Sequence, residues 1–186
     1  MAFIVAGGGV VSYAEALDVR DKDQRVFEAN EIDFTNVPDA PANLDEYIED
    51  LATKATDRIN TKIRLSRQWR EYLGSTGSGY TSLENLPDFD PNKIVTHKPM
   101  FTDMCAFYVL KEFLLPKVAD FGDPESPDVQ KIQYYENKFN DYFTELMSDF
   151  IYYDADGDGT VENGEKKVSF NILRRGRGRR NVVRVR

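Results

Sequence analysis

Apolar positions in residues 44–63 recur every three to four residues, which is the spacing of one buried helical stripe. Asn43 is a good N-cap for this segment, acidic residues crowd its start, and basic residues crowd its end, as the helix dipole favours. The pattern continues, after a kink, to Trp69 and Tyr72, which we expect to anchor it in the core. The stripe consists of Leu44, Tyr47, Ile48, Leu51, Ala55, Ile59 and Ile63.

Two further helices are expected in the second half of the chain. Residues Pro99 to Leu115 are so apolar that they predict the most buried helix, and Pro116 should end or kink it. The next helix begins with Ser126 as N-cap and Pro127 at its first position, where proline is favoured. Its stripe is Ile132, Tyr135, Phe139, Tyr142, Phe143, Leu146 and Phe150, and it continues through Ile151, Tyr152 and Tyr153 directly into an acidic loop.

The N-terminal part predicts two short helices. Ser12-Tyr-Ala-Glu15 has the pattern of a capping box, with Ser12 as N-cap of a helix that ends near Val19. Residues 21–28 predict a second polar helical turn with Val26 and Phe27 facing inward. Residues 33–41 are a linker, because they contain two prolines and several turn formers.

A long loop and an alternating C-terminal segment complete the pattern. Gly74 to His97 predicts a central loop, and structureless loops of that length are usually functional or ordered by a partner. Val168–Ile172 and Val183–Arg186 alternate with period two, which fits either a hairpin or an extended arm. The expected fold is therefore mainly α, a small bundle of about four to five helices with a long central loop and an extended or hairpin C-terminal arm.

The charge of the chain changes sign near its end. All 32 acidic residues lie at or before Glu165, and nine of the 24 basic residues lie in residues 166–186. Residues 1–165 thus carry 15 basic against 32 acidic residues, a formal charge of −17, while residues 166–186 carry +9. We divide the chain into a helical domain (residues 1–153), an acidic loop (residues 154–165) and a basic arm (residues 166–186). Such an asymmetry points to an arm that seeks an acidic partner.

The acidic loop matches the loop that wraps calcium in an EF-hand, which needs oxygen ligands at fixed positions and a glycine at position six. Gly159 is at position six, and a long helix is expected to enter the loop. The segment after the loop predicts a strand instead of the second helix, so a polar turn without metal remains the alternative. The calcium ligands of this interpretation are Asp154, Asp156, Asp158, Thr160, Glu162 and Glu165.

The basic arm has three interpretations. Arginine-rich segments bind phosphate backbones by counterion release, and they also dock on acidic protein surfaces. The third interpretation is a solvated tail. The arm has no aromatic residue after residue 173, so base stacking is not supported. The arginines concerned are Arg174, Arg175, Arg177, Arg179, Arg180, Arg184 and Arg186.

No catalytic constellation is present in the sequence. The single histidine, His97, cannot form a two-histidine metal site, and the single cysteine, Cys105, lies in an apolar helical pattern and predicts a packed core residue. The glycine run after Gly74 lacks the Lys-Ser/Thr pair and the preceding strand of a phosphate-binding loop. No run of about 18 apolar residues predicts a membrane span. We expect no enzyme activity and no required cofactor, with calcium as the one candidate ion.

Taken in order, these segments resemble a head–tail connector (adaptor) protein of a tailed bacteriophage. The resemblance rests on the opening Ser12-Tyr-Ala-Glu15, on residues 21–30, on the helix at 44–66 that ends in Gln68-Trp-Arg-Glu-Tyr72, on the helices at 101–115 and 129–153, and on the polar loop before a basic arm.

The resemblance implies a structural protein of the virion that is assembled in the host cytoplasm. Members of this family are small helical bundles that form a ring, typically of twelve copies, beneath the portal protein. They extend the DNA channel, let DNA pass without specific binding, and receive the next neck or tail protein. The arm would then grip the portal, and a neighbouring subunit or the next ring would order the central loop. The alternatives are a calcium-binding interaction module and a nucleic-acid-binding protein acting through its arm.

Overall fold

Helices make up most of the part of the chain that the computed structural model describes, which comprises residues 3–28, 44–75, 83–122, 126–149 and 152–161. The mainly α-helical fold predicted from the sequence is therefore confirmed. The elements in chain order are β1 (Ile4–Ala6), β2 (Gly9–Ser12), α1 (Ala16–Lys22), α2 (Gln24–Glu28), α3 (Leu44–Leu65), α4 (Arg67–Ser75), the 3-10 turns η1 (Leu83–Asn85) and η2 (Pro91–Lys93), α5 (Lys98–Val109), a π-helical turn (Leu110–Leu114), α6 (Leu115–Val118) and α7 (Pro127–Asp149).

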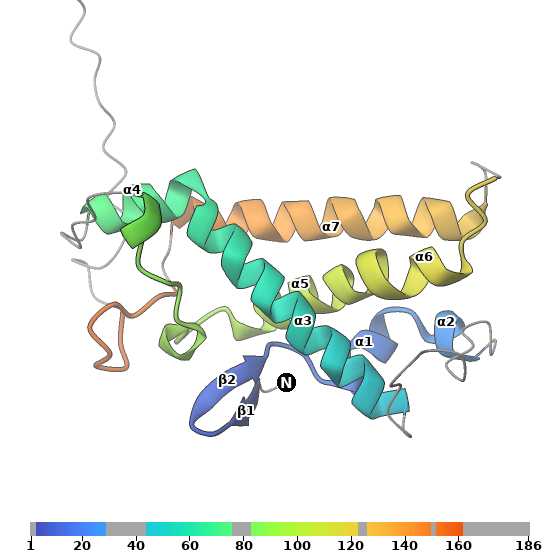
Figure 1. Cartoon of the computed structure of the whole chain (residues 1–186), viewed down its shortest axis with the longest axis horizontal. Helices are drawn as coiled ribbons and strands as arrows, with labels where there is room; N and C mark the ends of the chain where they lie inside the picture. Colours follow the sequence, from blue (N-terminus) through green and yellow to red (C-terminus); the bar gives the residue numbers. More distant parts are fainter. Residues whose placement is uncertain (1–2, 29–43, 76–82, 123–125, 150–151, 162–186) are drawn as a thin grey trace, which may run out of the picture.

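Three long helical segments form the bundle. Figure 1 shows α7 alongside α5 and α6, with α3 crossing them diagonally and the small β-hairpin lying below. The predicted stripe of α3 is confirmed, because Tyr47, Ile48, Leu51, Ala55, Ile59 and Ile63 are buried and Leu44 packs against the core. The kink is also confirmed, since the helix breaks at Ser66 before α4, which buries Trp69 and Tyr72.

Helix α5 is the central buried element, as its composition predicts. Phe101, Met104, Cys105 and Val109 are fully buried, and α5 packs against α1, α3 and α7. Burial raises the pKa of the Cys105 thiol to about 12, so this cysteine stays protonated and unreactive at neutral pH.

Pro116 does not end the helix at its own position. The backbone widens into the π-helical turn just before it, where the Leu115 N–H donates to the Leu110 carbonyl five residues earlier. The helix then continues as α6 and ends two residues after the proline, at Val118. A wider turn at this point accommodates a residue that has no N–H to donate.

The prediction for the N-terminus is wrong in one respect. Ser12 does not cap a helix, because it ends strand β2 of an antiparallel hairpin that turns at Gly7 and Gly8, both with positive φ. The cap of α1 is Glu15, which forms a capping box with Asp18. Ser12 instead bonds locally to Ala14, so an alternative local partner satisfies the serine.

The described part of the central loop packs against its own chain. Leu86, Phe89 and Ile94 are buried, the Trp69 indole N–H donates to the Pro87 carbonyl at 3.1 Å, and the N–H of Val95 donates to the Tyr152 carbonyl at 2.9 Å. Residues 83–97 therefore pack on the helical domain of the same chain.

Helix α7 begins after Ser126 as predicted, and it buries Tyr135, Phe139 and Leu146 against the core. The predicted linker at residues 33–41, the glycine-rich head of the central loop at residues 76–82 and Phe150 lie outside the described residues. Among the helices that the structure describes, none is both long and apolar enough to cross a bilayer.

We predict that Phe101→Ala lowers the free energy of unfolding by about 3–5 kcal/mol, because it leaves a cavity in the core. The Phe101 ring is fully buried and contacts the rings of Phe3, Tyr13, Phe89 and Tyr152. Urea-induced unfolding followed by Trp69 fluorescence measures the change. The matched control, Phe121→Ala, removes a ring that is 66% exposed and should change stability by at most about 0.5 kcal/mol. Equal effects of the two substitutions would contradict the buried position of Phe101.

Candidate functional site

The acidic loop begins from an extended segment of the chain. Helix α7 ends at Asp149, and Tyr153 forms an antiparallel bridge with Ile94. The Asp154 N–H also donates to the Lys93 carbonyl at 2.9 Å. The expectation that a helix runs directly into the loop is therefore wrong, because the backbone of residues 152–154 pairs with residues 93–95 instead.

A cluster of aromatic rings holds this segment in place. We call Trp69, Tyr72, Phe89 and Tyr153 the aromatic cluster; all four residues are buried. The Tyr153 ring lies 5.2 Å from the Trp69 ring, 5.8 Å from the Tyr72 ring and 5.0 Å from the Phe89 ring, measured between centroids. Burial raises the pKa of Tyr153 to about 12, so its hydroxyl remains neutral and accepts a hydrogen bond from the Asp90 N–H.

Within the loop, each aspartate accepts hydrogen bonds from the backbone that follows it. Asp154 accepts from the N–H groups of Gly157 at 2.6 Å and Gly159 at 2.7 Å. Both glycines have positive φ, 84° and 90°, a conformation that residues with a Cβ rarely adopt. The glycine requirement at position six, inferred from the sequence, is thus met in the backbone.

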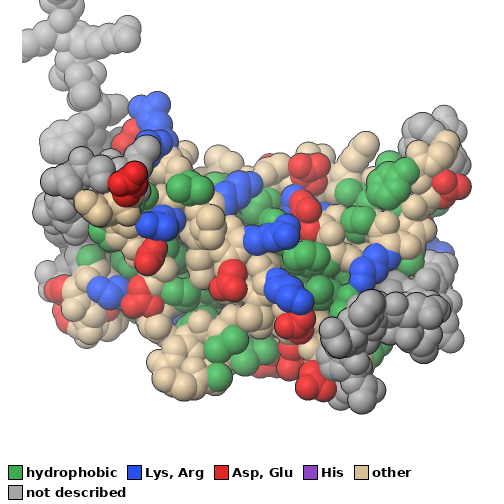
Figure 2. Space-filling model, in the orientation of Figure 1, with side chains coloured by type: hydrophobic (Ala, Val, Ile, Leu, Met, Phe, Trp, Pro, Cys, Tyr) green, Lys and Arg blue, Asp and Glu red, His purple; other side chains and the backbone are tan. Residues whose placement is uncertain are grey.

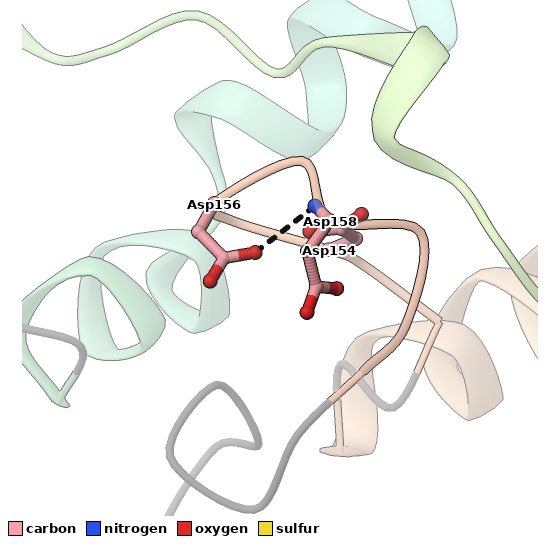
Figure 3. A group of neighbouring side chains, drawn as sticks. All are labelled: Asp154, Asp156 and Asp158. Atoms are coloured by element: carbon pink, nitrogen blue, oxygen red, sulfur yellow. Dashed lines mark hydrogen bonds between the residues drawn. The ribbon is translucent and has the colours of Figure 1, made fainter.

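The three aspartates converge on one side of the loop. Figure 3 shows their carboxylates and the hydrogen bond from the Asp158 N–H to Asp156, which is 3.1 Å long. One oxygen from each of Asp154, Asp156 and Asp158 lies within 4.8 Å of the others. Carboxylate oxygens are the ligands that calcium prefers, so the donor chemistry fits a hard divalent cation.

The electrostatics of Asp154 differ from those of its neighbours because it is buried, whereas Asp156 and Asp158 are exposed. Burial alone raises the pKa of a carboxyl group. The hydrogen bonds from Gly159 and Gly157 outweigh that effect, and the net result is a pKa below the ordinary value for aspartate. Asp154 is therefore ionised while it anchors the loop.

The structure places four of the six predicted calcium ligands. Asp154, Asp156 and Asp158 come together, and Thr160 uses its amide and hydroxyl groups to bond the Asp158 carboxylate, each at 2.8 Å. Glu162 and Glu165 lie outside the described residues, as do the arm arginines Arg174, Arg175, Arg177, Arg179, Arg180, Arg184 and Arg186.

The sequence interpretation missed the segment that supports the loop. In η2, the Asp90 carboxylate accepts from the Asn92 N–H at 2.9 Å, Lys93 donates to the Ala155 carbonyl, and Ile94 forms the bridge to Tyr153. The pair Asp90-Pro91, a capping residue followed by proline, is a helix-start signal that identifies this turn in the sequence. The pairing of Ile94 with Tyr153 has no comparable local signal.

No protein-family model, no curated protein and no solved structure matches this chain. The function is therefore inferred from the residues and their arrangement.

The lowered pKa of Asp154 predicts a pH-dependent contribution to stability. The contribution is fully present above the unfolded-state pKa, about 3.9, and is lost as the pH falls through the lower folded-state pKa. Asp154→Asn should therefore lower the melting temperature at pH 6, and the difference from the wild type should shrink below about pH 4. Melting curves between pH 2 and pH 7 measure this. Asp141→Asn on the exposed surface of α7 is the matched control, and an equal, pH-independent loss in both variants would refute the prediction.

Proposed function

We propose that this chain is a structural adaptor subunit of a tailed-bacteriophage neck, which joins the portal to the next neck or tail component. The observation that carries the proposal is the fixed position of residues 152–154 at the start of the acidic loop, which we call the joint. The bridge between Ile94 and Tyr153, the hydrogen bonds of Asp154 and the aromatic cluster all attach this segment to the helical domain.

A fixed joint suits a protein that positions a partner. The basic arm follows the acidic loop in sequence, and the first residues of that loop are held against a bundle with a packed core. Binding energy of an arm attached to a fixed point is transmitted to the helical domain, whereas a tail attached to a loose end only tethers it. This arrangement supports an assembly function over an unattached, solvated tail.

The charge distribution supports the same proposal. The helical domain, residues 1–153, carries 15 basic against 27 acidic residues, a formal charge of −12, so a channel lined by it would repel DNA and let it slide past. The arm carries +9 and is suited to an acidic surface of the portal. The proposed assembly is a homo-oligomeric ring in the virion, with the portal and the next neck or tail protein as partners.

We predict that the full-length chain binds the portal ring encoded beside its gene, and that neutralising the arm weakens that binding. The test replaces all seven arm arginines with glutamine in the full-length chain. Removing seven charges from an electrostatic contact should weaken binding at least about tenfold and reduce its salt dependence. Co-sedimentation with the purified portal ring at increasing salt measures both effects.

The control for that experiment is a set of lysine-to-glutamine changes on the helical domain, at Lys54 and Lys138, which should leave binding unchanged. Absence of binding by the wild-type chain would sink the adaptor proposal. Retention of duplex DNA by the wild type and not by the arm variant, without portal binding, would favour the nucleic-acid-binding alternative.

A second candidate function is calcium binding at the acidic loop, which the convergence of Asp154, Asp156 and Asp158 supports. We propose that an ion at this position would stiffen the joint between helical domain and arm. The entering segment is extended, unlike that of an EF-hand, so this candidate is a structural ion site and not a calcium sensor.

Calcium at about ten times a millimolar dissociation constant should stabilise the fold by about 1.4 kcal/mol and raise the melting temperature. Trp69 should report the binding, since its ring contacts Tyr153, the residue before Asp154. Calorimetric melting and tryptophan fluorescence during a calcium titration measure the two effects. The double variant Asp156→Asn/Asp158→Asn should lose both responses, and Asp141→Asn should keep them. A wild type that shows neither response rules out the ion site.

A further inference from the structure

A cluster of basic groups lies over aromatic rings where α3 meets the π-helical turn and α7. Lys62 Nζ lies 4.4 Å from the centroid of the Phe139 ring and 4.7 Å from that of Phe143. Lys111 Nζ lies 5.1 Å from the Phe139 ring, and the Arg58 guanidinium lies 5.3 Å from the Phe113 ring. Figure 2 shows one face of the molecule, on which Lys and Arg side chains alternate with Asp and Glu side chains and with hydrophobic ones. We call Arg58, Lys62 and Lys111, with the rings beneath them, the basic surface.

The basic surface is unusual in a strongly acidic chain. Burial lowers the pKa of Lys62, and the neighbouring Lys111 lowers it further, so these two cations repel each other. Glu112 and Glu136 offset this in part, and Glu112 pairs with Lys111 at 3.0 Å. The three cations Arg58, Lys62 and Lys111 outnumber the two neighbouring carboxylates, so this surface keeps a positive charge that suits an acidic partner.

An acidic surface lies on the same molecule, where α3 begins beside α1. Glu15, Asp45 and Glu49 line a crevice of about 200 Å³ together with Leu17, whose side chain is 64% exposed. Arg20 in the same crevice pairs with Asp45 at 2.5 Å. This one cation stands against three carboxylates, so the crevice keeps a net negative charge. We call Glu15, Leu17, Asp45 and Glu49 the acidic surface.

The two surfaces have opposite charges, and α3 contributes residues to both at different heights. Glu49 and Lys62 are thirteen residues apart on α3, about 20 Å at the helical rise. The acidic surface also exposes the Leu17 side chain, whereas in the basic surface Phe139 is fully buried and Phe113 and Phe143 are partly buried. Two different complementary surfaces on one chain produce head-to-tail association, which closes into a ring when the rotation between copies allows it.

We propose that the basic surface of one copy binds the acidic surface of the next copy. This inference deepens the proposed function and rests on it, since an adaptor ring needs a subunit interface. The occupant of each surface is a second copy of this chain, because the two surfaces carry opposite charges.

The test uses charge reversals in the purified full-length chain, without any portal. Light scattering at low ionic strength measures self-association of the wild type, of Lys62→Glu and of Glu49→Lys. Each single variant should associate at least about tenfold more weakly than the wild type, since like charges then face each other. An equimolar mixture of the two variants should recover association, because the reversed surfaces pair with each other. Lys138→Glu, which changes the charge equally on α7 over the Tyr134 ring, should associate like the wild type.

Three results would overturn the interface: a wild type that stays monomeric at every concentration, an effect of Lys138→Glu equal to that of Lys62→Glu, or no recovery in the mixture. Thermal melting verifies that each variant folds, and Arg58→Glu replaces Lys62→Glu if that variant does not. The arginine-to-glutamine arm variant should still self-associate; its failure to do so would show that the arm occupies one of the surfaces and would also overturn the proposal. Portal binding is measured separately. A wild-type chain that binds the portal but does not self-associate would refute this interface and leave the proposed function standing.

Discussion

The fold depends on the packing of aromatic rings at one end of the bundle. Trp69 from α4, Phe89 from the central loop and Tyr153 from the segment after α7 are far apart in sequence and meet in the aromatic cluster. Each ring buries a large apolar area, and ring pairs at these separations add a favourable electrostatic contribution. The bridge between Ile94 and Tyr153 satisfies backbone groups that this burial would otherwise leave without partners. The cluster and the bridge together hold the central loop and the start of the acidic loop against the helical domain.

The joint, residues 152–154, links the packed helical domain to the acidic loop, on which both candidate functions rest. The ionised Asp154 accepts two backbone hydrogen bonds just after the bridge, so the chain turns at a defined point as it leaves the helical domain. The exposed Asp156 and Asp158 then face solvent beside it. A calcium ion, an acidic partner bound by the arm, or both, would act on a segment whose position the aromatic cluster already fixes.

Much of the helical domain is predictable from local patterns. The three-four spacing in α3, the apolar run in α5 and the Ser126-Pro127 start of α7 each reflect a physical preference that acts within a few turns of chain. The N-terminus is the exception. Ser12-Tyr-Ala-Glu15 satisfies the capping pattern, yet the hairpin extends through Ser12 and the Tyr13 N–H donates to Thr56 of α3. A contact between segments thus displaced the helix start by three residues.

The sequence by itself determined the helical class, the buried stripes, the change of charge at residue 165 and the spacing of aspartates and glycines in the acidic loop. These follow from side-chain type and from distances of a few residues along the chain. Only the tertiary structure decided that the segment before the loop pairs with residues 93–95, that the central loop packs on its own domain, and that Lys62 and Lys111 meet over Phe139. Those contacts join residues 18 to 77 positions apart, and hydrophobic burial, being non-directional, leaves no local signal of which segments will share it.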